Sequence, residues 1–579
     1  MDNAVVLFEN PRIRLGGAAL NAGEHIHHAA ARAVGGGIEW RAEAGQVSLR
    51  GKCEEQEPEL WHISFELTNS GADAEVGVML PYAFYHIEQE RPLRFFDPTF
   101  GGVLKTAAVP IGRTYPGPAS FCLTAAVGEK AAIATGLLDG EQRRVMIRHT
   151  PSVHYGQIRF ALERVLVKSG QTVALPMQYI KAAPTWAEAF EPYKTWFNEM
   201  FPRVAPRSEW LASGKYIETR LAHCLVPFEP FKAPSGVLIF DNEGPARSIE
   251  TIKAEIDQAF ERGAKEGYTP LFYQYGWWEA MASFKGLFAF DSHCGDYTKR
   301  HDYAKKSVEY IHQKGGKVYL YTNFISIGDE SEIYREHPDL LARDKAGFPQ
   351  YNAGYPMLML CPGAPGIRDY WRRVVDCILT EIGADGIFLD QVCGGHSPQY
   401  CYCEAHHHAH PDTYGVDAIE LVKHILDYAK SVKPDCYVGG ELMLDSRSVL
   451  LDETHGYGYS GPPDYAAAVE RGEPMPEYYV FAKYLCPGLY SSNGSVMDGA
   501  SGRGGQEIWR DYRPCFEAGV TPCATDTPDA IAYLYGPANG KSVLAARSAK
   551  AGVVKVTLPD GSKVAVETLG LEPVYQIVE

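Results

Sequence analysis

A short apolar strand that runs directly into an acidic residue is the feature that most constrains the fold of this chain. Residues Gly383–Cys393 read GADGIFLDQVC, so Asp390 follows a glycine turn and the apolar run Ile387–Leu389. The preceding segment, Ile367–Ile382, has apolar residues at helical spacing with charges between them. A helix, a tight turn, a buried strand and an acidic end together predict one repeat of a parallel βα sheet.

A second strand of the same kind follows, in which Cys436–Gly440 runs into Glu441. The two acidic residues are 441 − 390 = 51 positions apart, which places them in adjacent repeats. In a closed βα-barrel the C-terminal ends of the strands carry the chemistry. Either residue alone could cap a helix or pair with an arginine. Two carboxylates that face each other across a pocket are typical of glycosidic bond cleavage, and the pair favours that role.

The composition limits the classes of partner. A chain of 579 residues, 45% of them hydrophobic, can bury more than one core. Its net charge of −17 argues against a nucleic-acid partner, because nothing concentrates Lys and Arg against phosphate. No apolar run is long enough for a membrane span, and the first residues lack the pattern of a secretory signal. With 13 scattered Cys, an odd number, we expect reduced thiols and a cytoplasmic protein. Homo-oligomerisation stays open.

The chain divides by its periodicity into four parts. Residues 1–183 contain short alternating runs such as Trp61–Leu67 and Gln157–Val167, which predict an N-terminal β-sandwich. Residues 184–205 have an apolar stripe at helical spacing and predict a linker helix. The βα pattern of 206–540 predicts a catalytic (β/α)8 barrel of the TIM type, and 541–579 predict a small C-terminal set of β-strands. The fold class is therefore α/β.

The order of the expected barrel strands sets the positions of the two carboxylates. Asp390 ends the fourth expected strand and Glu441 ends the fifth. A helix over Gln506–Ala518 separates two less distinct later strands. The expected strands other than these two are Gly236–Phe240, Thr269–Tyr275, Lys317–Tyr321, Tyr478–Tyr484 and Gly519–Thr525.

The two carboxylates suit different roles in a retaining reaction. We expect Asp390 to be the ionised nucleophile that attacks the anomeric carbon. Glu441 is then the general acid and base, and its pKa must be raised by burial or by a negative neighbour so that it holds a proton.

A segment rich in cysteine and histidine follows Asp390. Cys393–Pro411 reads CGGHSPQYCYCEAHHHAHP, which matches no standard zinc finger or ribbon. Zinc is one interpretation and a solvated polar loop is another. We favour a third, in which Cys401, His406 and His408 contact substrate, so no cofactor is expected. The zinc candidates are Cys393, Cys401, Cys403, His406, His408 and His410.

Further residues at the expected strand ends could shape a sugar pocket. Aromatic faces stack on sugar rings, and carboxylates and amides accept or donate hydrogen bonds to hydroxyls. The candidates of this kind are Asp241, Glu243, Tyr275, Trp277, Trp278, Glu279, Asn323 and Asp526. A glycine- and serine-rich run, Gly494–Gly505, is typical of a mobile active-site loop.

At these residues the chain resembles bacterial retaining α-glycosidases. The strand DGIFLDQV is similar to the nucleophile strand of a group of glycoside hydrolases known as domain of unknown function 6259. In that group a Cys-aromatic-x-x-x-His-x-His element follows the strand, and Cys401-Tyr402, His406 and His408 match it. GGELMLD resembles the strand that carries the acid/base Glu in α-amylase-type barrels. If family 36 is the better template, the acid/base is an Asp on strand six, and Asp498 competes with Glu441.

The resemblance implies a retaining glycoside hydrolase that acts on an α-glycosidic bond of a carbohydrate substrate. Two alternatives remain open. One is a non-catalytic carbohydrate-binding protein on a degenerate barrel, and the other is a zinc-dependent hydrolase that uses the Cys/His segment.

Overall fold

The computed structural model describes residues 4–8, 12–15, 27–28, 30–34, 37–203 with gaps at 82, 88–92, 100, 107 and 154, 208–212, 216–222, 231–232, 238–239, 248–275, 277–279, 296–300, 302–328, 332–352, 357–393, 400–455, 480–489, 512, 514–516, 518–527, 530–570 and 573–579. The chain divides into two compact units. Unit 1 comprises Met1–Pro202, Met443–Val449 and Gly456–Glu579, and unit 2 comprises Arg203–Leu442 and Leu450–His455. No helix among the described residues is long and apolar enough to cross a membrane.

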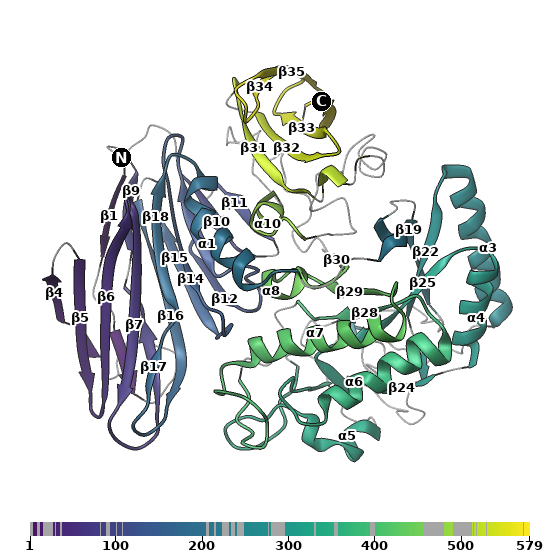
Figure 1. The fold of residues 1–579 in the computed structure, drawn as a ribbon, viewed down its shortest axis with the longest axis horizontal. Coiled ribbons are helices and arrows are strands. Elements are labelled where there is room, and N and C mark those ends of the chain that lie inside the picture. Colours follow the sequence, from purple (N-terminus) through teal and green to yellow (C-terminus); the bar gives the residue numbers. More distant parts are fainter. Residues whose placement is uncertain are drawn as a thin grey trace. The chain divides into compact units, whose positions relative to one another are not determined.

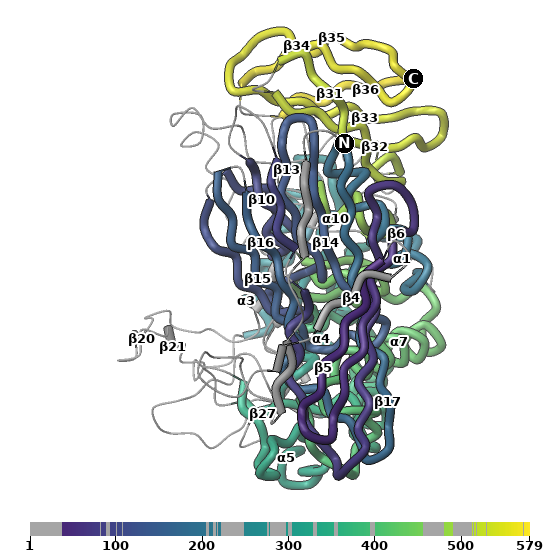
Figure 2. Tube along the Cα trace, turned by 90° about the vertical axis from the view of Figure 1, so that its left-hand side faces the viewer, coloured from purple at the N-terminus to yellow at the C-terminus, as the bar shows by residue number. Residues whose placement is uncertain are grey.

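The N-terminal part of unit 1 is a sandwich of two antiparallel sheets, as the alternating runs predict. One sheet contains β1 (Ala4–Phe8), β2 (Arg12–Leu15), β3 (His27–His28), β8 (Ala74–Met79), β9 (Ala83–Ile87), β12 (Ile111–Tyr115), β15 (Val145–Pro151) and β16 (Tyr155–Val167). The other contains β4 (Ala30–Val34), β5 (Gly37–Ala44), β6 (Val47–Glu57), β7 (Leu60–Asn69), β10 (Arg94–Asp97), β11 (Val103–Lys105), β13 (Leu123–Val127), β14 (Ala132–Leu138), β17 (Thr172–Ala174) and β18 (Met177–Ala183). Strands β5 and β6 run side by side as a long hairpin (Figure 2).

The two sheets share one core. His149 of β15 is fully buried, and its Nε2 lies 2.7 Å from the Tyr85 hydroxyl of the same sheet. Its Nδ1 lies 3.0 Å from the hydroxyl of Thr124 in the facing sheet. Burial lowers the pKa of His149 to about 3, so this histidine is a neutral core residue that joins the sheets.

Helix α1 (Trp186–Met200) follows the sandwich and belongs to unit 1. Thr185 caps its N-terminus by accepting a hydrogen bond from the backbone N–H of Glu188 at 3.3 Å. The buried residues of the helix are Trp186, Ala189, Phe190, Tyr193 and Phe197. The helix therefore exists where the spacing predicts it.

A buried carboxylate completes the core of unit 1. Asp445, in the short helix α8 (Asp445–Ser448), accepts hydrogen bonds from the hydroxyls of Tyr193 at 2.6 Å and Tyr115 at 2.9 Å. Burial raises its pKa to about 7, although these hydrogen bonds oppose the rise. The segment Met443–Val449 thus packs with the N-terminal residues of unit 1 through specific polar contacts.

Unit 2 is built on six parallel strands in the order β19 (Tyr216–Ala222), β22 (Thr269–Tyr275), β25 (Lys317–Asn323), β28 (Gly386–Asp390), β29 (Tyr437–Glu441) and β30 (Glu453–His455). The helices that connect them, α3 (Ile249–Glu266), α4 (Asp302–Gln313), α6 (Ile367–Asp376) with the π-helical turn η2 (Cys377–Ile382), and α7 (Tyr414–Val432), lie along one side of the strands (Figure 1). Gly383, at φ 86°, ends η2 and turns the chain into β28.

The remaining elements of unit 2 are short. Helix α2 (Glu209–Ala212) precedes β19, and α5 (Glu332–Glu336) and η1 (Pro338–Leu340) lie between β25 and β28. The two-stranded pairs are β20 (Phe231–Lys232) with β21 (Leu238–Ile239), β23 (Trp278–Glu279) with β24 (Asp296–Arg300), and β26 (Ser326–Gly328) with β27 (Met357–Met359).

The first strand of the parallel sheet corrects the sequence prediction. We expected it at Gly236–Phe240, but only Leu238–Ile239 is described as a strand there, and it pairs antiparallel with β20. The parallel sheet instead begins with β19. This strand contains Glu218 and Arg220, so it lacks the apolar run of a buried strand. Asp390 and Glu441 nevertheless end the fourth and fifth strands in the observed order.

Two later predictions are also wrong. The segment expected as strand Tyr478–Tyr484 contains helix α10 (Val480–Leu485), because a short buried apolar run has no periodicity that separates a strand from a helix. The strand expected at Gly519–Thr525 exists as β31 (Val520–Thr525), but it belongs to an antiparallel sheet with β32 (Ala530–Ala538), β33 (Lys541–Ser548), β34 (Gly552–Thr557), β35 (Lys563–Thr568) and β36 (Val574–Val578). These C-terminal strands form one group (Figure 2). Most of the helix expected at Gln506–Ala518 lies outside the described residues.

Candidate active site

The parallel register brings three polar side chains to the same edge of the sheet. Asn323 at the end of β25 is the register partner of Asp390 at the end of β28. The pairing of Leu389 with Gly440 places Glu441, at the end of β29, beside Asp390. Asp390 is 6% exposed and Glu441 is 9% exposed, so both carboxyl groups are buried. The sequence prediction that both lie at the ends of neighbouring strands is confirmed.

Neutral donors hold Asp390. Its Oδ2 accepts a hydrogen bond from the Tyr321 hydroxyl at 2.7 Å and from the Asn323 side-chain amide at 3.3 Å. Among the residues that the structure describes, no Lys or Arg forms an ion pair with Asp390. Among the described residues, neutral hydrogen-bond donors therefore orient this carboxylate.

Glu441 has a raised pKa. Burial and the charge of Asp390 raise the pKa of Glu441 well above its usual value, and the backbone N–H of Gln391 opposes this rise. That N–H donates to Glu441 Oε2 at 3.0 Å. The raised pKa favours the protonated form of Glu441, which is the form that a general acid needs.

The residue after each carboxylate has an unusual backbone. Gln391 has φ 58° and Leu442 has φ 65°, in the left-handed region of backbone conformation that residues other than glycine rarely adopt. The contacts of Gln391 stabilise its conformation, because its N–H donates to Glu441 and its Oε1 accepts from Asn352 Nδ2 at 3.0 Å. Such strain, about 1 kcal/mol or more per residue, collects at functional sites because it fixes side chains there.

Aromatic rings fill the sheet face on which the carboxylates lie. Tyr319 stacks on Tyr273 with ring centroids 5.1 Å apart and lies 4.7 Å from Tyr437. Phe388, two residues before Asp390, lies 4.3 Å from the His455 ring. The layer gives the carboxyl pair an apolar base, which strengthens electrostatic effects there. These aromatic rings thus serve packing at these positions.

Several predicted sugar-binding residues have other surroundings. Trp277 is fully buried, and its Nε1 donates to the Tyr321 carbonyl at 2.7 Å, so its ring faces protein and not a ligand. Asp526 is exposed in unit 1, where its Oδ1 accepts from the Lys555 N–H at 2.9 Å after strand β31. Neither joins the carboxyl pair. Three further predicted residues, Asp241, Glu243 and Asp498, and the loop Gly494–Gly505 lie outside the described residues, as do the side chains of Tyr275, Trp278 and Glu279.

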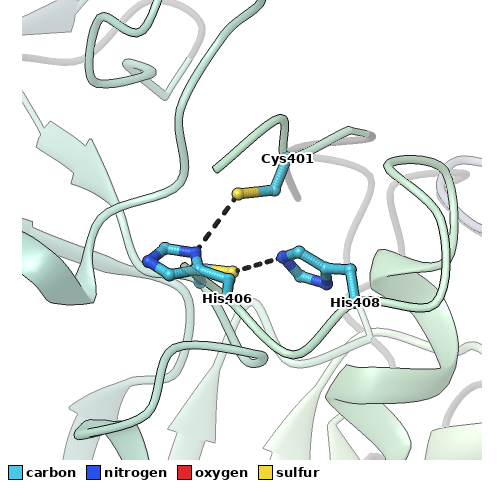
Figure 3. Close-up of side chains that lie close together, drawn as sticks. Cys401, His406 and His408 are labelled. Atoms are coloured by element: carbon cyan, nitrogen blue, oxygen red, sulfur yellow. Dashed lines mark hydrogen bonds between the residues drawn. The ribbon is translucent and has the colours of Figure 1, made fainter. Parts of the chain in front are cut away.

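The Cys/His segment forms a compact cluster within unit 2. Cys401, His406 and His408 point toward one another (Figure 3), and Cys361 joins them from the segment after β27. The ligand atoms of all four lie within 4.8 Å of one another. Sequence reasoning missed Cys361 because 40 residues separate it from Cys401, so no local spacing connects the two.

The cluster gives Cys401, His406 and His408, which we expected to contact substrate, partners within the protein. Every ring nitrogen of His406 and His408 has a partner within the protein, as described below. The other predicted zinc candidates, Cys393, Cys403 and His410, are not part of the cluster. The hydrogen bond from Cys361 lowers the pKa of Cys401 to about 2, and although burial opposes it, Asp417 and Cys401 raise the pKa of His408 to about 9.

Comparisons with known proteins agree with this architecture. The family model described as "Domain of unknown function (DUF6259)" matches residues 180–485. No curated protein matches the chain. The structure of alpha-N-acetylgalactosaminidase NagBb from Bifidobacterium bifidum in complex with GalNAc is 12% identical, with a TM-score of 0.61 over 96% of this chain and 94% of that chain.

Two further structures are similar over almost the whole chain. The GH36 alpha-galactosidase AgaB from Geobacillus stearothermophilus is 10% identical, with a TM-score of 0.50 over 99% of this chain and 86% of that chain. A variant of AgaA from the same organism, in complex with raffinose, is 10% identical, with a TM-score of 0.51 over 99% of this chain and 87% of that chain. At these identities the likeness shows a shared fold.

Proposed function

This chain belongs to the family described as a domain of unknown function (DUF6259), and on that premise we propose that it is a glycoside hydrolase that cleaves an α-glycosidic bond with retention of configuration. The observation that carries the proposal is the buried pair Asp390 and Glu441 at the ends of adjacent parallel strands, with the pKa of Glu441 raised by burial and by the charge of Asp390. The fold shared with structures named as alpha-galactosidase and alpha-N-acetylgalactosaminidase supports it. We also propose that the six parallel strands are part of a (β/α)8 barrel.

In the proposed reaction Asp390 attacks the anomeric carbon while Glu441 donates its proton to the leaving oxygen. A glycosyl–Asp390 ester forms and the glycosidic C–O bond breaks. Glu441, now ionised, takes a proton from water, which attacks the anomeric carbon and releases Asp390. The hydrogen bonds from Tyr321 and Asn323 orient the nucleophile.

A screen of aryl α- and β-glycosides tests the proposal. We expect hydrolysis of α-glycosides, with the α-anomer as the first product detected by proton NMR. A β-anomer as first product would contradict retention. Sugar binding without turnover of any aryl glycoside would favour the alternative of a non-catalytic carbohydrate-binding protein.

Covalent trapping tests the nucleophile directly. A fluorinated glycosyl fluoride that forms a slowly hydrolysed glycosyl-enzyme should label one peptide, the peptide that contains Asp390. A label on another carboxylate would remove Asp390 from the mechanism.

A further inference from the structure

The cluster of Cys361, Cys401, His406 and His408 has the composition of a metal centre, and it is separate from the carboxyl pair. Two thiols and two imidazoles converge from two segments of unit 2. Cys361 lies between β27 and α6, whereas the other three residues lie between β28 and α7. Both cysteines are free, so the sulfur atoms are available to bind an ion.

The distances fit one tetrahedral ion. Cys401 Sγ lies 3.4 Å from His406 Nδ1, and Cys361 Sγ lies 3.0 Å from His408 Nε2. With metal–nitrogen and metal–sulfur bonds of about 2.0–2.3 Å, a tetrahedron has edges of about 3.3–3.8 Å. Only small shifts are needed to place four ligand atoms around a common centre.

Hydrogen bonds outside the cluster direct one nitrogen of each ring toward the sulfur atoms. His406 Nε2 donates to the Asp339 carbonyl at 2.8 Å, so Nδ1 keeps its lone pair on the side of Cys401. His408 Nδ1 donates to the Asp417 carboxylate at 2.5 Å, so Nε2 is the nitrogen that faces Cys361. Metal-binding histidines have this arrangement almost without exception, because the outer acceptor fixes the ring and its tautomer.

The backbone around the cluster also suits thiolates and a close ring. The N–H of Arg343 points at Cys401 Sγ from 3.5 Å. A Cβ on Gly363 would lie 2.7 Å from Cε1 of the His408 ring, so a side chain there would displace this ring. The glycine gives His408 the space that its position requires.

We propose that these four residues bind one Zn²⁺ ion as a structural site. Two sulfurs and two nitrogens in a tetrahedron select zinc among the common metals, and four protein ligands leave no position for water. The ion would therefore not act in hydrolysis. It would fasten the segment that follows Asp390 to the segment that precedes α6.

Metal content of the purified full-length protein is the first test. We expect about one zinc per chain by plasma mass spectrometry, and less than a tenth of that in Cys361→Ser and His406→Ala. The matched controls are Cys403→Ser and His407→Ala, which alter the same segment outside the cluster and should keep the metal. Asp417→Asn should weaken zinc binding by about 10–100-fold.

Cobalt substitution gives a reading that does not depend on activity or on the folding of variants. Co²⁺ added to chelator-treated protein should give the visible bands of a tetrahedral site and the near-ultraviolet band of thiolate ligation, and Zn²⁺ should abolish both. Chelator-treated protein should melt at a lower temperature than the zinc form. A protein purified without metal that melts identically with and without Zn²⁺ would overturn the proposal, as would a disulfide between Cys361 and Cys401.

Discussion

An aspartate lies at each end of strand β28, and the two side chains have opposite surroundings. Asp385, just before the strand, accepts from Lys317 Nζ and Lys433 Nζ, both at 3.0 Å, and lies 2.7 Å from His312 Nε2. Asp390, at the other end, has neutral donors and a neighbouring acid. Two lysines therefore balance the charge of Asp385, whereas the described hydrogen-bond donors of Asp390 are neutral.

The pKa directions express the same contrast. Although burial raises it, the hydrogen bond from His312 and the charges of Lys433 and Lys317 hold the pKa of Asp385 below its usual range. At the opposite end of the strands the pKa of Glu441 is raised. In βα-barrels the N-terminal ends of the strands serve stability and the C-terminal ends serve chemistry, and the roles that we propose for Asp385 and Asp390 follow this division within six residues.

Replacing Asp390 with Asn should have the largest effect. The amide keeps the shape and cannot form the glycosyl ester, so we expect kcat to fall by about 10⁴-fold or more with no loss of thermal stability. Steady-state kinetics and a melting curve measure both. Asp385→Asn is the matched control, and its turnover per folded molecule should stay near that of the wild type. Normal turnover by Asp390→Asn would contradict the contrast between a catalytic Asp390 and a structural Asp385.

Glu441→Ala should have the next largest effect, and its size should depend on the leaving group. We expect a loss of about 10²–10⁴-fold in kcat/KM on glycosides with poor leaving groups and a much smaller loss on dinitrophenyl glycosides, which depart without a proton. Azide should restore part of the turnover and give a glycosyl azide of the substrate's configuration. Equal losses on both substrates, without azide rescue, would assign Glu441 a structural role and direct attention to Asp498.

Asp385→Asn should affect stability and not chemistry. Removal of the buried charge leaves Lys317 and Lys433 without their common anion, so we expect a loss of about 2 kcal/mol in the free energy of unfolding. Denaturant titration of unit 2 by tryptophan fluorescence measures it. Asp369→Asn, which removes an exposed ion pair with Arg372, should change stability by less than about 0.5 kcal/mol. A similar effect of both variants would contradict the special role of Asp385.

The pH dependence of stability should have opposite signs at the two ends, and this is the smallest effect. The depressed pKa of Asp385 contributes stability above about pH 3.8 that is lost as the pH falls, so the deficit of Asp385→Asn should shrink in acid. The raised pKa of Glu441 contributes stability that is present below about pH 4.5 and lost as the pH rises. Glu441→Gln should therefore become more stable than the wild type, by about 1 kcal/mol, toward neutral pH. Parallel pH profiles of the two variants would contradict this difference.

Sequence patterns predicted those parts of the fold that are determined by residues close to one another in the sequence. Asp390 follows an apolar strand and a glycine turn, and both lie within eight residues of it. The parallel register then places Glu441 beside it, because equivalent ends of neighbouring strands meet at one edge. The sandwich strands were predictable for the same reason, since alternation is a property of each strand alone.

The parts that were missed depend on distant partners. Strand β19 was missed because Glu218 interrupts its apolar pattern, and Glu218 is satisfied by the Tyr319 hydroxyl 101 residues later. Strand β31 resembles a barrel strand until its antiparallel partners β32 and β34 are known. Cys361 has no local motif, and only the fold brings it to Cys401. Contacts between residues that are far apart in the sequence determine these three features, and local sequence patterns do not reveal such contacts.

The buried carboxylate of Asp445 has a consequence for the timing of synthesis. Its partner Tyr193 precedes it by 252 residues, and both belong to unit 1. At about 5–20 residues per second a ribosome needs about 13–50 s to reach Asp445 after Tyr193. During that interval the Tyr193 hydroxyl lacks its acceptor. The N-terminal sandwich thus emerges as an incomplete body, and this core carboxylate arrives only after five of the six parallel strands of unit 2 have been made.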